Sequence, residues 1–249
     1  MTGATLLLSF ILGAMFGSFA NVLIHRLPYG ESIVAPRSHC PACFTTIAPW
    51  DNVPILSFLV LRGRCRSCGA PIPVRYLLVE VTMGLLAVAV VAHFGLTLDA
   101  FRFGLLAFLL LVVVWTDIEH GIIPNAVTYP GIVLGLASSA LAGVGLSALE
   151  AAAGAAAVFL AISIASRGGM GGGDVKLAAM MGAFLGGPAI IVALFLAVAL
   201  GALVGIVLIV LRLRTRKQTI PFGPSLAVGA LIAVFAANDL VRWYITRMW

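Results

Sequence analysis

The sequence predicts an all-α polytopic membrane protein with about eight transmembrane helices and a small metal-binding loop domain between the first two. Three observations support this fold class. Hydrophobic residues make up 62% of the 249 residues and only 10% are charged. Mean hydropathy is +1.15, far above that of globular domains. All four cysteines lie in one polar stretch, at 26–75.

The spans follow from the apolar runs, because crossing a bilayer takes about 20 apolar residues. A β-barrel is not expected, because the run at 105–115 (LLAFLLLVVVW) is continuously apolar rather than alternating. The first run has no basic segment before it, so we expect a retained helix and not a signal peptide. The candidate spans are residues 4–25, 76–96, 101–118, 127–145, 149–166, 174–187, 188–211 and 223–246.

The sixth span is short, and only 186–188 (GGP) separate it from the seventh, so a merged or tilted pair is an alternative. The Ala-rich segment 148–157 predicts a helix that packs closely through small side chains. The expected organisation is a first transmembrane helix at 1–25, a cytoplasmic four-cysteine loop at 26–75 and a seven-helix membrane core at 76–249.

Orientation follows from the basic residues, which collect in cytoplasmic loops. With the four-cysteine loop inside, only Arg102, Arg242 and Arg247 lie outside, so both termini are expected on the outer side. A nucleic-acid partner is not expected, since the basic segment 212–217 (RLRTRK) is short and abuts an apolar run, as a snorkelling helix end does. The predicted inner side holds Arg26, Arg37, Arg62, Arg64, Arg66, Arg75, Arg167, Lys176, Arg212, Arg214, Arg216 and Lys217.

The cysteines form two C-x2-C pairs, Cys40 with Cys43 and Cys65 with Cys68, separated by 21 residues. Two such pairs place four thiolates around one ion, the tetrahedral shell of a structural zinc site. A loop of this size does not bury enough core to fold alone, so metal binding would stabilise it. Disulfides, redox thiols or unpaired cysteines are the alternatives, and His25 and His39 are possible competing ligands.

Two aspartates lie at the ends of apolar runs, where carboxylates are costly and indicate function. Asp117 ends the third span, and Asp174 opens the sixth after the glycines at 171–173. Two spans lie between them, so both are expected near the cytoplasmic face. Alternatives are pairing of Asp117 with His120 or Arg167, and a helix N-cap for Asp174.

Two close carboxyl groups do not readily both ionise, so the pair supplies one acid and one base. This is the chemistry of peptide hydrolysis by an aspartic dyad, and the glycine-rich turn lets an extended substrate backbone approach. Paired membrane carboxylates also serve proton-coupled transporters, a different class that stays open at this point.

Several ordered motifs resemble prepilin peptidases, the bifunctional leader peptidases and N-methyltransferases of type IV pilus and type II secretion systems, within the G-x-G-D class of intramembrane aspartic proteases. Asn125 departs from many relatives, which have an aspartate there. The matching segments are 17–22 (GSFANV), 26–28 (RLP), 36–43 (PRSHCPAC), 50–54 (WDNVP), 61–65 (LRGRC), 73–80 (PVRYLLVE), 117–124 (DIEHGIIP), 169–176 (GMGGGDVK) and 220–227 (IPFGPSLA).

The resemblance implies cleavage of prepilins and pseudopilins after a Gly at the cytoplasmic face of a bacterial inner membrane, by Asp117 and Asp174. Methylation of the new N-terminus would follow, with S-adenosylmethionine as donor; a peptidase without methyl transfer is the alternative.

The same resemblance implies roles for further residues. It places Gly171, Gly173 and Lys176 in support of the catalytic loop. Asn21, Arg26 and Glu80 are its candidates for the methyl-transfer site, although Glu80 is alternatively a snorkelling carboxylate or one paired with Arg75. Since Lys176 follows Asp174 by two residues, their side chains are expected on different faces of a helix.

Overall fold

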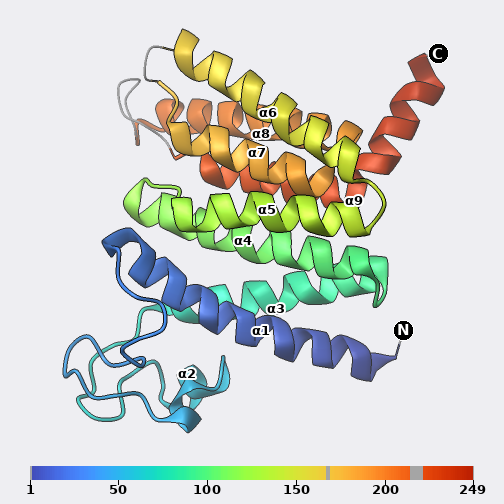
Figure 1. The fold of residues 1–249 in the computed structure, drawn as a ribbon. Coiled ribbons are helices and arrows are strands. Elements are labelled where there is room, and N and C mark those ends of the chain that lie inside the picture. The colour runs from blue at the N-terminus through green and yellow to red at the C-terminus, as the bar shows by residue number, and fades with distance from the viewer. Residues whose placement is uncertain (1, 167–168, 214–220, 249) are drawn as a thin grey trace. The chain divides into compact units, whose positions relative to one another are not determined.

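The structure is a computed structural model that describes residues 2–166, 169–213 and 221–248 (Figure 1). Over these residues it is helical, with isolated β-bridges but no longer strand, so the predicted fold class is confirmed. The chain forms two compact units, Met1–Val112 and Val113–Trp249. The helices in order are α1 (Gly3–Arg26), η1 (Leu27–Tyr29), η2 (Pro49–Asn52), α2 (Leu56–Val60), α3 (Val74–Phe94), α4 (Leu98–His120), α5 (Asn125–Leu141), α6 (Gly145–Ala165), α7 (Gly172–Leu185), α8 (Gly187–Val210) and α9 (Gly223–Met248).

Six of the described helices are long and apolar enough to cross a membrane: α1, α3, α4, α6, α8 and α9. Each of the eight expected spans does coincide with a helix, but a count of eight crossings is not confirmed. The two that fall short are α5, with 17 residues, and α7, with 14. At about 1.5 Å per residue α7 is roughly 21 Å long, against a hydrocarbon core of about 30 Å.

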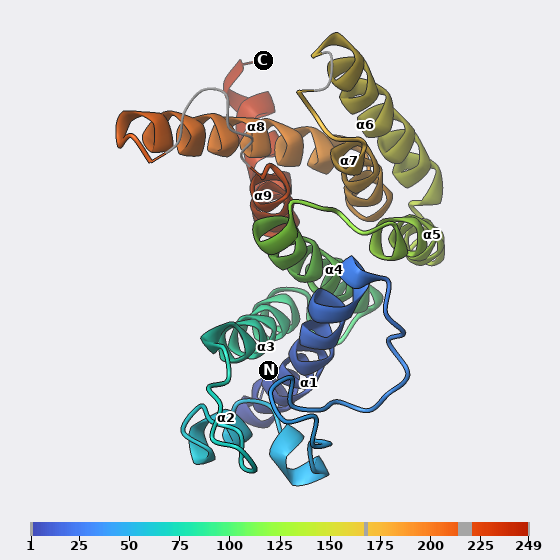
Figure 2. The same cartoon turned by 90° about the vertical axis from the view of Figure 1, so that its left-hand side faces the viewer.

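The shortness of α7 is explained by its surroundings. Every residue from Leu177 to Leu185 is buried, and the helix packs against α5, α6, α8 and α9 (Figures 1 and 2). An apolar helix without a polar face is buried within protein or lipid, and here protein covers α7. It ends at Gly186, whose φ of +71° breaks the helix, and Pro188 lies in the first turn of α8. The two runs are therefore separate helices.

In the first unit, α1 and α3 lie side by side, and glycines bring their backbones together (Figures 1 and 2). A Cβ on Gly13 would lie 2.6 Å from Cβ of Ala87, and one on Gly17 would lie 2.7 Å from Cα of Glu80. This small-xxx-small spacing is typical of close membrane helix pairs. The pair forms the base from which the loop between α1 and α3 leaves and to which it returns.

In the second unit, small residues also allow α6 and α7 to pack closely. A Cβ on Gly182 would lie 2.6 Å from the backbone of Ala151. Ala148, Ala151, Ala152 and Ala155 are buried, as expected for the Ala-rich segment. This packing fixes the carboxyl half of α7 against α6, whereas Asp174, in the first turn of α7, is half-buried.

Candidate functional site

The four cysteines come together in the loop between α1 and α3. Their Sγ atoms all lie within 4.8 Å of one another, and those of Cys40 and Cys68 are 3.8 Å apart. Four sulfurs placed about 2.3 Å from one tetrahedral metal ion are about 3.8 Å apart, whereas a disulfide needs about 2.05 Å. All four cysteines are free. The cluster therefore fits a metal ion and not two disulfides.

Two turns of the same geometry present these cysteines. In the first turn the N–H of Cys40 donates to Thr45 O at 3.0 Å; in the second, the N–H of Cys65 donates to Ala70 O at 2.8 Å. The residue after each pair, Phe44 or Gly69, has a positive φ and donates its N–H to the carbonyl of the first cysteine. Each residue of the second turn lies 25 positions after its counterpart, as with 40 and 65. Only the C-x2-C pattern reveals this duplication in the sequence.

Thr45 interacts with the thiol of Cys43. Hydrogen bonding with the Thr45 side chain and backbone lowers the pKa of Cys43 to about 6. The thiolate is the form that binds metal. His39 stacks on Phe44, and neither His39 nor His25 belongs to the cluster of four ligands.

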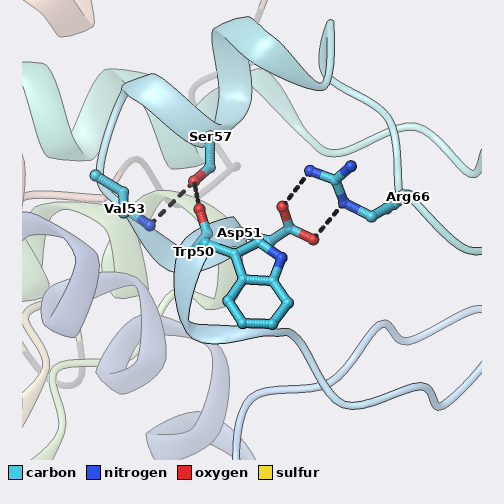
Figure 3. Close-up of polar contacts among 5 residues, drawn as sticks. All are labelled: Trp50, Asp51, Val53, Ser57 and Arg66. Carbon is cyan, nitrogen blue, oxygen red and sulfur yellow. Dashed lines mark hydrogen bonds and ion pairs between the residues drawn. The ribbon is translucent and has the colours of Figure 1, made fainter.

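The segment between the two turns is tied to the second one (Figure 3). Arg66 donates two hydrogen bonds to the Asp51 carboxylate, at 2.7 and 2.6 Å, and this contact lowers the pKa of Asp51 below its usual range. Ser57 accepts from the N–H of Val53 at 3.0 Å and donates to Trp50 O at 3.1 Å. These contacts join η2 and α2 to the residue that follows Cys65.

Asn21 and Glu80, two of the three methyl-transfer candidates, lie where α1 meets α3. Asn21 donates to Tyr76 O at 3.0 Å, while its buried Oδ1 has no partner among the described residues. Glu80 is only 8% exposed and accepts from the N–H of Ile55 at 2.7 Å. Ile55 has a φ of +65°, which is strained for a β-branched residue. Glu80 is thus neither snorkelling nor simply paired with an arginine; it holds a strained turn of the loop.

Arg26, the third candidate, belongs to a different place. Its guanidinium donates to Ser32 O and to Pro36 O, each at 2.7 Å, and so folds the first part of the loop against the end of α1. Arg26 and Asn21 are five positions apart, which places them about 140° apart around a helix. The structure therefore does not bring the three candidates into one cluster.

In the second unit, Asp117 lies in the last turn of α4 and is 6% exposed. Its Oδ2 accepts the backbone N–H of Gly223 at 2.8 Å. Gly223 begins α9, and the amino end of a helix stabilises a carboxylate. The partner of Asp117 is thus a backbone amide. Arg167, proposed as an alternative partner, lies outside the described residues, as do Arg214, Arg216 and Lys217 of the predicted inner side.

Asp174 lies in the first turn of α7, whose N-cap is Gly171, so Asp174 is not itself the cap. The carboxyl group turns back toward Gly171, where a Cβ would lie 3.6 Å from Oδ2. The carboxyl groups of Asp174 and Asp117 lie close enough to interact electrostatically. The catalytic pairing of the two aspartates stays a prediction, with which this electrostatic interaction is consistent.

The glycine-rich turn and Lys176 hold the start of α7 against α5 and the loop before it. A Cβ on Gly173 would lie 3.0 Å from Cβ of Ile123, so a larger residue would push α7 away. Lys176 donates to the side chain of Asn125 and lies 5.5 Å from the ring of Tyr129. Both contacts of Lys176 are with residues of α5.

Taken together, a helical membrane unit with paired aspartates beside a glycine-rich turn defines the class of intramembrane aspartic proteases, here joined to a unit with a four-cysteine loop. Comparison with known families agrees. Residues 11–94 match the bacterial peptidase A24 N-terminal domain, and residues 104–206 match the type IV leader peptidase family. The chain belongs to the type IV leader peptidase family.

Full-length relatives support this assignment, and each is named as a prepilin leader peptidase/N-methyltransferase. The protein of Aeromonas hydrophila is 36% identical over 96% of this chain and 93% of its own length. The protein of Bacillus subtilis is 37% identical over 95% of this chain and 96% of its own length. The protein of Pseudomonas aeruginosa is 34% identical over 97% of this chain and 94% of its own length. No solved structure matches the chain significantly.

Proposed function

We propose that this protein cleaves the basic leader of type IV prepilins and pseudopilins after a Gly, and then methylates the new N-terminal residue. The names of its relatives support both activities. The observation that carries the cleavage step is the approach of Asp117 and Asp174 at the ends of α4 and α7. Asp117 and Asp174 would be the catalytic residues, with Gly171, Gly173 and Lys176 supporting their loop.

The pair would share one proton in the resting enzyme. The ionised carboxylate takes a proton from a water molecule, which attacks the carbonyl carbon of the scissile bond, while the protonated carboxyl donates a hydrogen bond to the carbonyl oxygen. The C–N bond then breaks, and the leaving nitrogen receives a proton and becomes the new amine. The Gly223 N–H keeps the Asp117 carboxylate in place through this sequence.

For the four-cysteine loop we propose one structural Zn²⁺ held by Cys40, Cys43, Cys65 and Cys68. The sulfur separations fit this ion, and four ligands leave no position for a substrate. The ion would supply folding free energy to the loop, not chemistry.

For methyl transfer, the first unit supplies the polar groups around the loop, and S-adenosylmethionine is the methyl-donating substrate. The amine nitrogen forms a bond to the methyl carbon as the bond from that carbon to sulfur breaks, and a proton leaves the nitrogen. Asn21 and Glu80 remain candidates on the face toward α3, and Arg26 on the face toward the loop.

We propose that the protein lies in a bacterial inner membrane with both termini on the outer side and the two aspartates near the cytoplasmic face. The excess of basic residues in the loops assigned to the inside supports this orientation.

The proposal is tested with purified protein in nanodiscs, one synthetic prepilin and mass spectrometry, with and without methyl donor. Wild type should release the leader and add one methyl group only when donor is present. Asp117→Asn and Asp174→Asn should each abolish cleavage, while Glu150→Gln, an exposed carboxylate on α6, should cleave normally. Substantial cleavage by either aspartate variant would exclude the dyad, and a mature product that never gains a methyl group would leave only the peptidase.

A further inference from the structure

A pocket of about 240 Å³ lies between the end of α1 and the loop that follows it, inside the first unit. One wall is formed by α1 through Phe19, Val22 and Arg26. The loop forms the other walls, with Arg37, Ser38 and Asn52 as polar residues. The rim is open, since Val34 is 85% exposed. The pocket is thus lined by apolar side chains but presents a mainly polar surface, which includes cationic and amide groups.

The most informative feature of this pocket is the charge of Arg26. The residue is only 7% exposed, although charged side chains are rarely buried without a partner. Both hydrogen bonds it donates go to neutral carbonyl oxygens, those of Ser32 and Pro36. These bonds fix the guanidinium in place without neutralising its charge.

The guanidinium has further donors for a ligand. It carries five N–H groups, and the two hydrogen bonds use one on each terminal nitrogen. A carboxylate that enters the pocket would therefore meet a preorganised cation with donors still available. Arg37, on the loop wall, adds a second positive charge.

The chemistry of a ligand for this pocket follows from these walls. It needs an anionic oxygen group for the two arginines, and Phe19 offers an aromatic surface that attracts a sulfonium or ammonium cation. S-adenosylmethionine has both groups in its amino-acid end. Its adenosine part is uncharged, and the open rim leaves room for it.

We propose that this pocket binds the amino-acid end of S-adenosylmethionine, with its carboxylate at Arg26 and Arg37 and its sulfonium beside Phe19. The inference rests on the proposed methyl transfer, for which it names the site of the donor. It also gives Arg26 a role separate from that of Asn21 and Glu80, which lie on the α3 side of α1.

The test measures binding by calorimetry to the full chain in nanodiscs, with two probes. S-adenosylhomocysteine carries the carboxylate, whereas 5′-methylthioadenosine has the same nucleoside and no carboxylate. Arg37→Gln should weaken S-adenosylhomocysteine about tenfold or more, because hydrogen bonds to charged groups are strong. The same variant should change 5′-methylthioadenosine less than twofold. Val22→Phe, which fills the pocket from α1, should weaken both probes.

Arg62→Gln is the control, since Arg62 lies on the same loop outside the pocket. It should bind both probes as wild type does, and metal content should be equal in all variants if the loop remains folded. Wild-type affinity for S-adenosylhomocysteine in both Arg37→Gln and Val22→Phe would overturn the pocket assignment while methylation stands. If wild type binds neither probe and never methylates a cleaved pilin, the proposed methyl transfer itself fails.

Discussion

Replacing Gly223 by alanine tests whether the backbone at the start of α9 positions the Asp117 carboxylate. A Cβ at this position would lie 2.6 Å from Oδ2 of Asp117 and 3.2 Å from its Cγ. Restoring an ordinary contact of 3.4 Å moves the carboxylate oxygen by about 0.8 Å. The backbone N–H of residue 223 is still present in the variant. The substitution therefore displaces the Asp117 carboxylate without removing its hydrogen-bond donor.

A displacement of about 1 Å in a catalytic group can cost about a hundredfold in rate. We therefore expect Gly223→Ala to lower kcat for leader cleavage by about that factor, equivalent to about 2.7 kcal/mol in the barrier. Overpacking a buried site also costs about 1–3 kcal/mol of stability. The unfolding temperature in detergent must accordingly be measured beside the rate, with cleavage of a synthetic prepilin followed by mass spectrometry.

Gly154→Ala serves as the control, because a Cβ at this position on α6 meets nothing within 4 Å. It should cleave at the wild-type rate. Wild-type cleavage by a folded Gly223→Ala protein would refute the reasoning, since Asp117 would then not depend on close contact with the start of α9.

Three further predictions concern the metal, the loop and the order of the two reactions. Wild type should contain about one zinc per chain. Cys65→Ser or chelation should lower the zinc content and make residues 36–72 more sensitive to proteolysis. Unchanged resistance to proteolysis would argue against a metal-dependent fold of the loop. The contact with Arg66 lowers the pKa of Asp51, so the ion pair stabilises the loop fully above the ordinary Asp pKa of about 3.9 and stops doing so as pH falls through the lowered pKa. The difference in stability between wild type and Asp51→Asn, measured by denaturant titration, should therefore shrink over that pH range. A difference that stays constant would contradict this prediction. Methylation should have a higher pH optimum than cleavage, because the amine must lose a proton with a pKa of about 8 whereas the dyad needs one carboxyl protonated. Cleavage is followed on intact prepilin and methylation on a supplied pre-cleaved pilin; coincident optima would count against separate sites.

Some parts of the site could be predicted because they depend on local spacing. The C-x2-C pairs led directly to the four-sulfur cluster, and the apolar runs located every long helix. The separation of Arg26 from Asn21 was also accessible, since positions five apart on a helix do not share a face.

Other features depend on contacts between distant segments. Nothing in the sequence around Asp117 indicates that its partner is a backbone N–H 106 residues later. The contact of Glu80 with Ile55 depends likewise on how the loop returns to α3. The number of membrane crossings could not be predicted for a different reason. Hydropathy indicates that a segment avoids water, but it does not distinguish burial in lipid from burial in protein, and α7 is buried in protein.

The contrast between α7 and α8 has a consequence for how the enzyme responds to its membrane. In the most apolar window of α8 only 17% of residues are buried within the protein, so most of that helix is left for lipid. A bilayer of different thickness acts on such a helix through mismatch and tilt. Protein surrounds α7 instead, and Asp174 lies in its first turn. The geometry of the carboxyl pair is therefore set by neighbouring helices, and the rate of leader cleavage should vary little with acyl-chain length even where α8 changes its tilt.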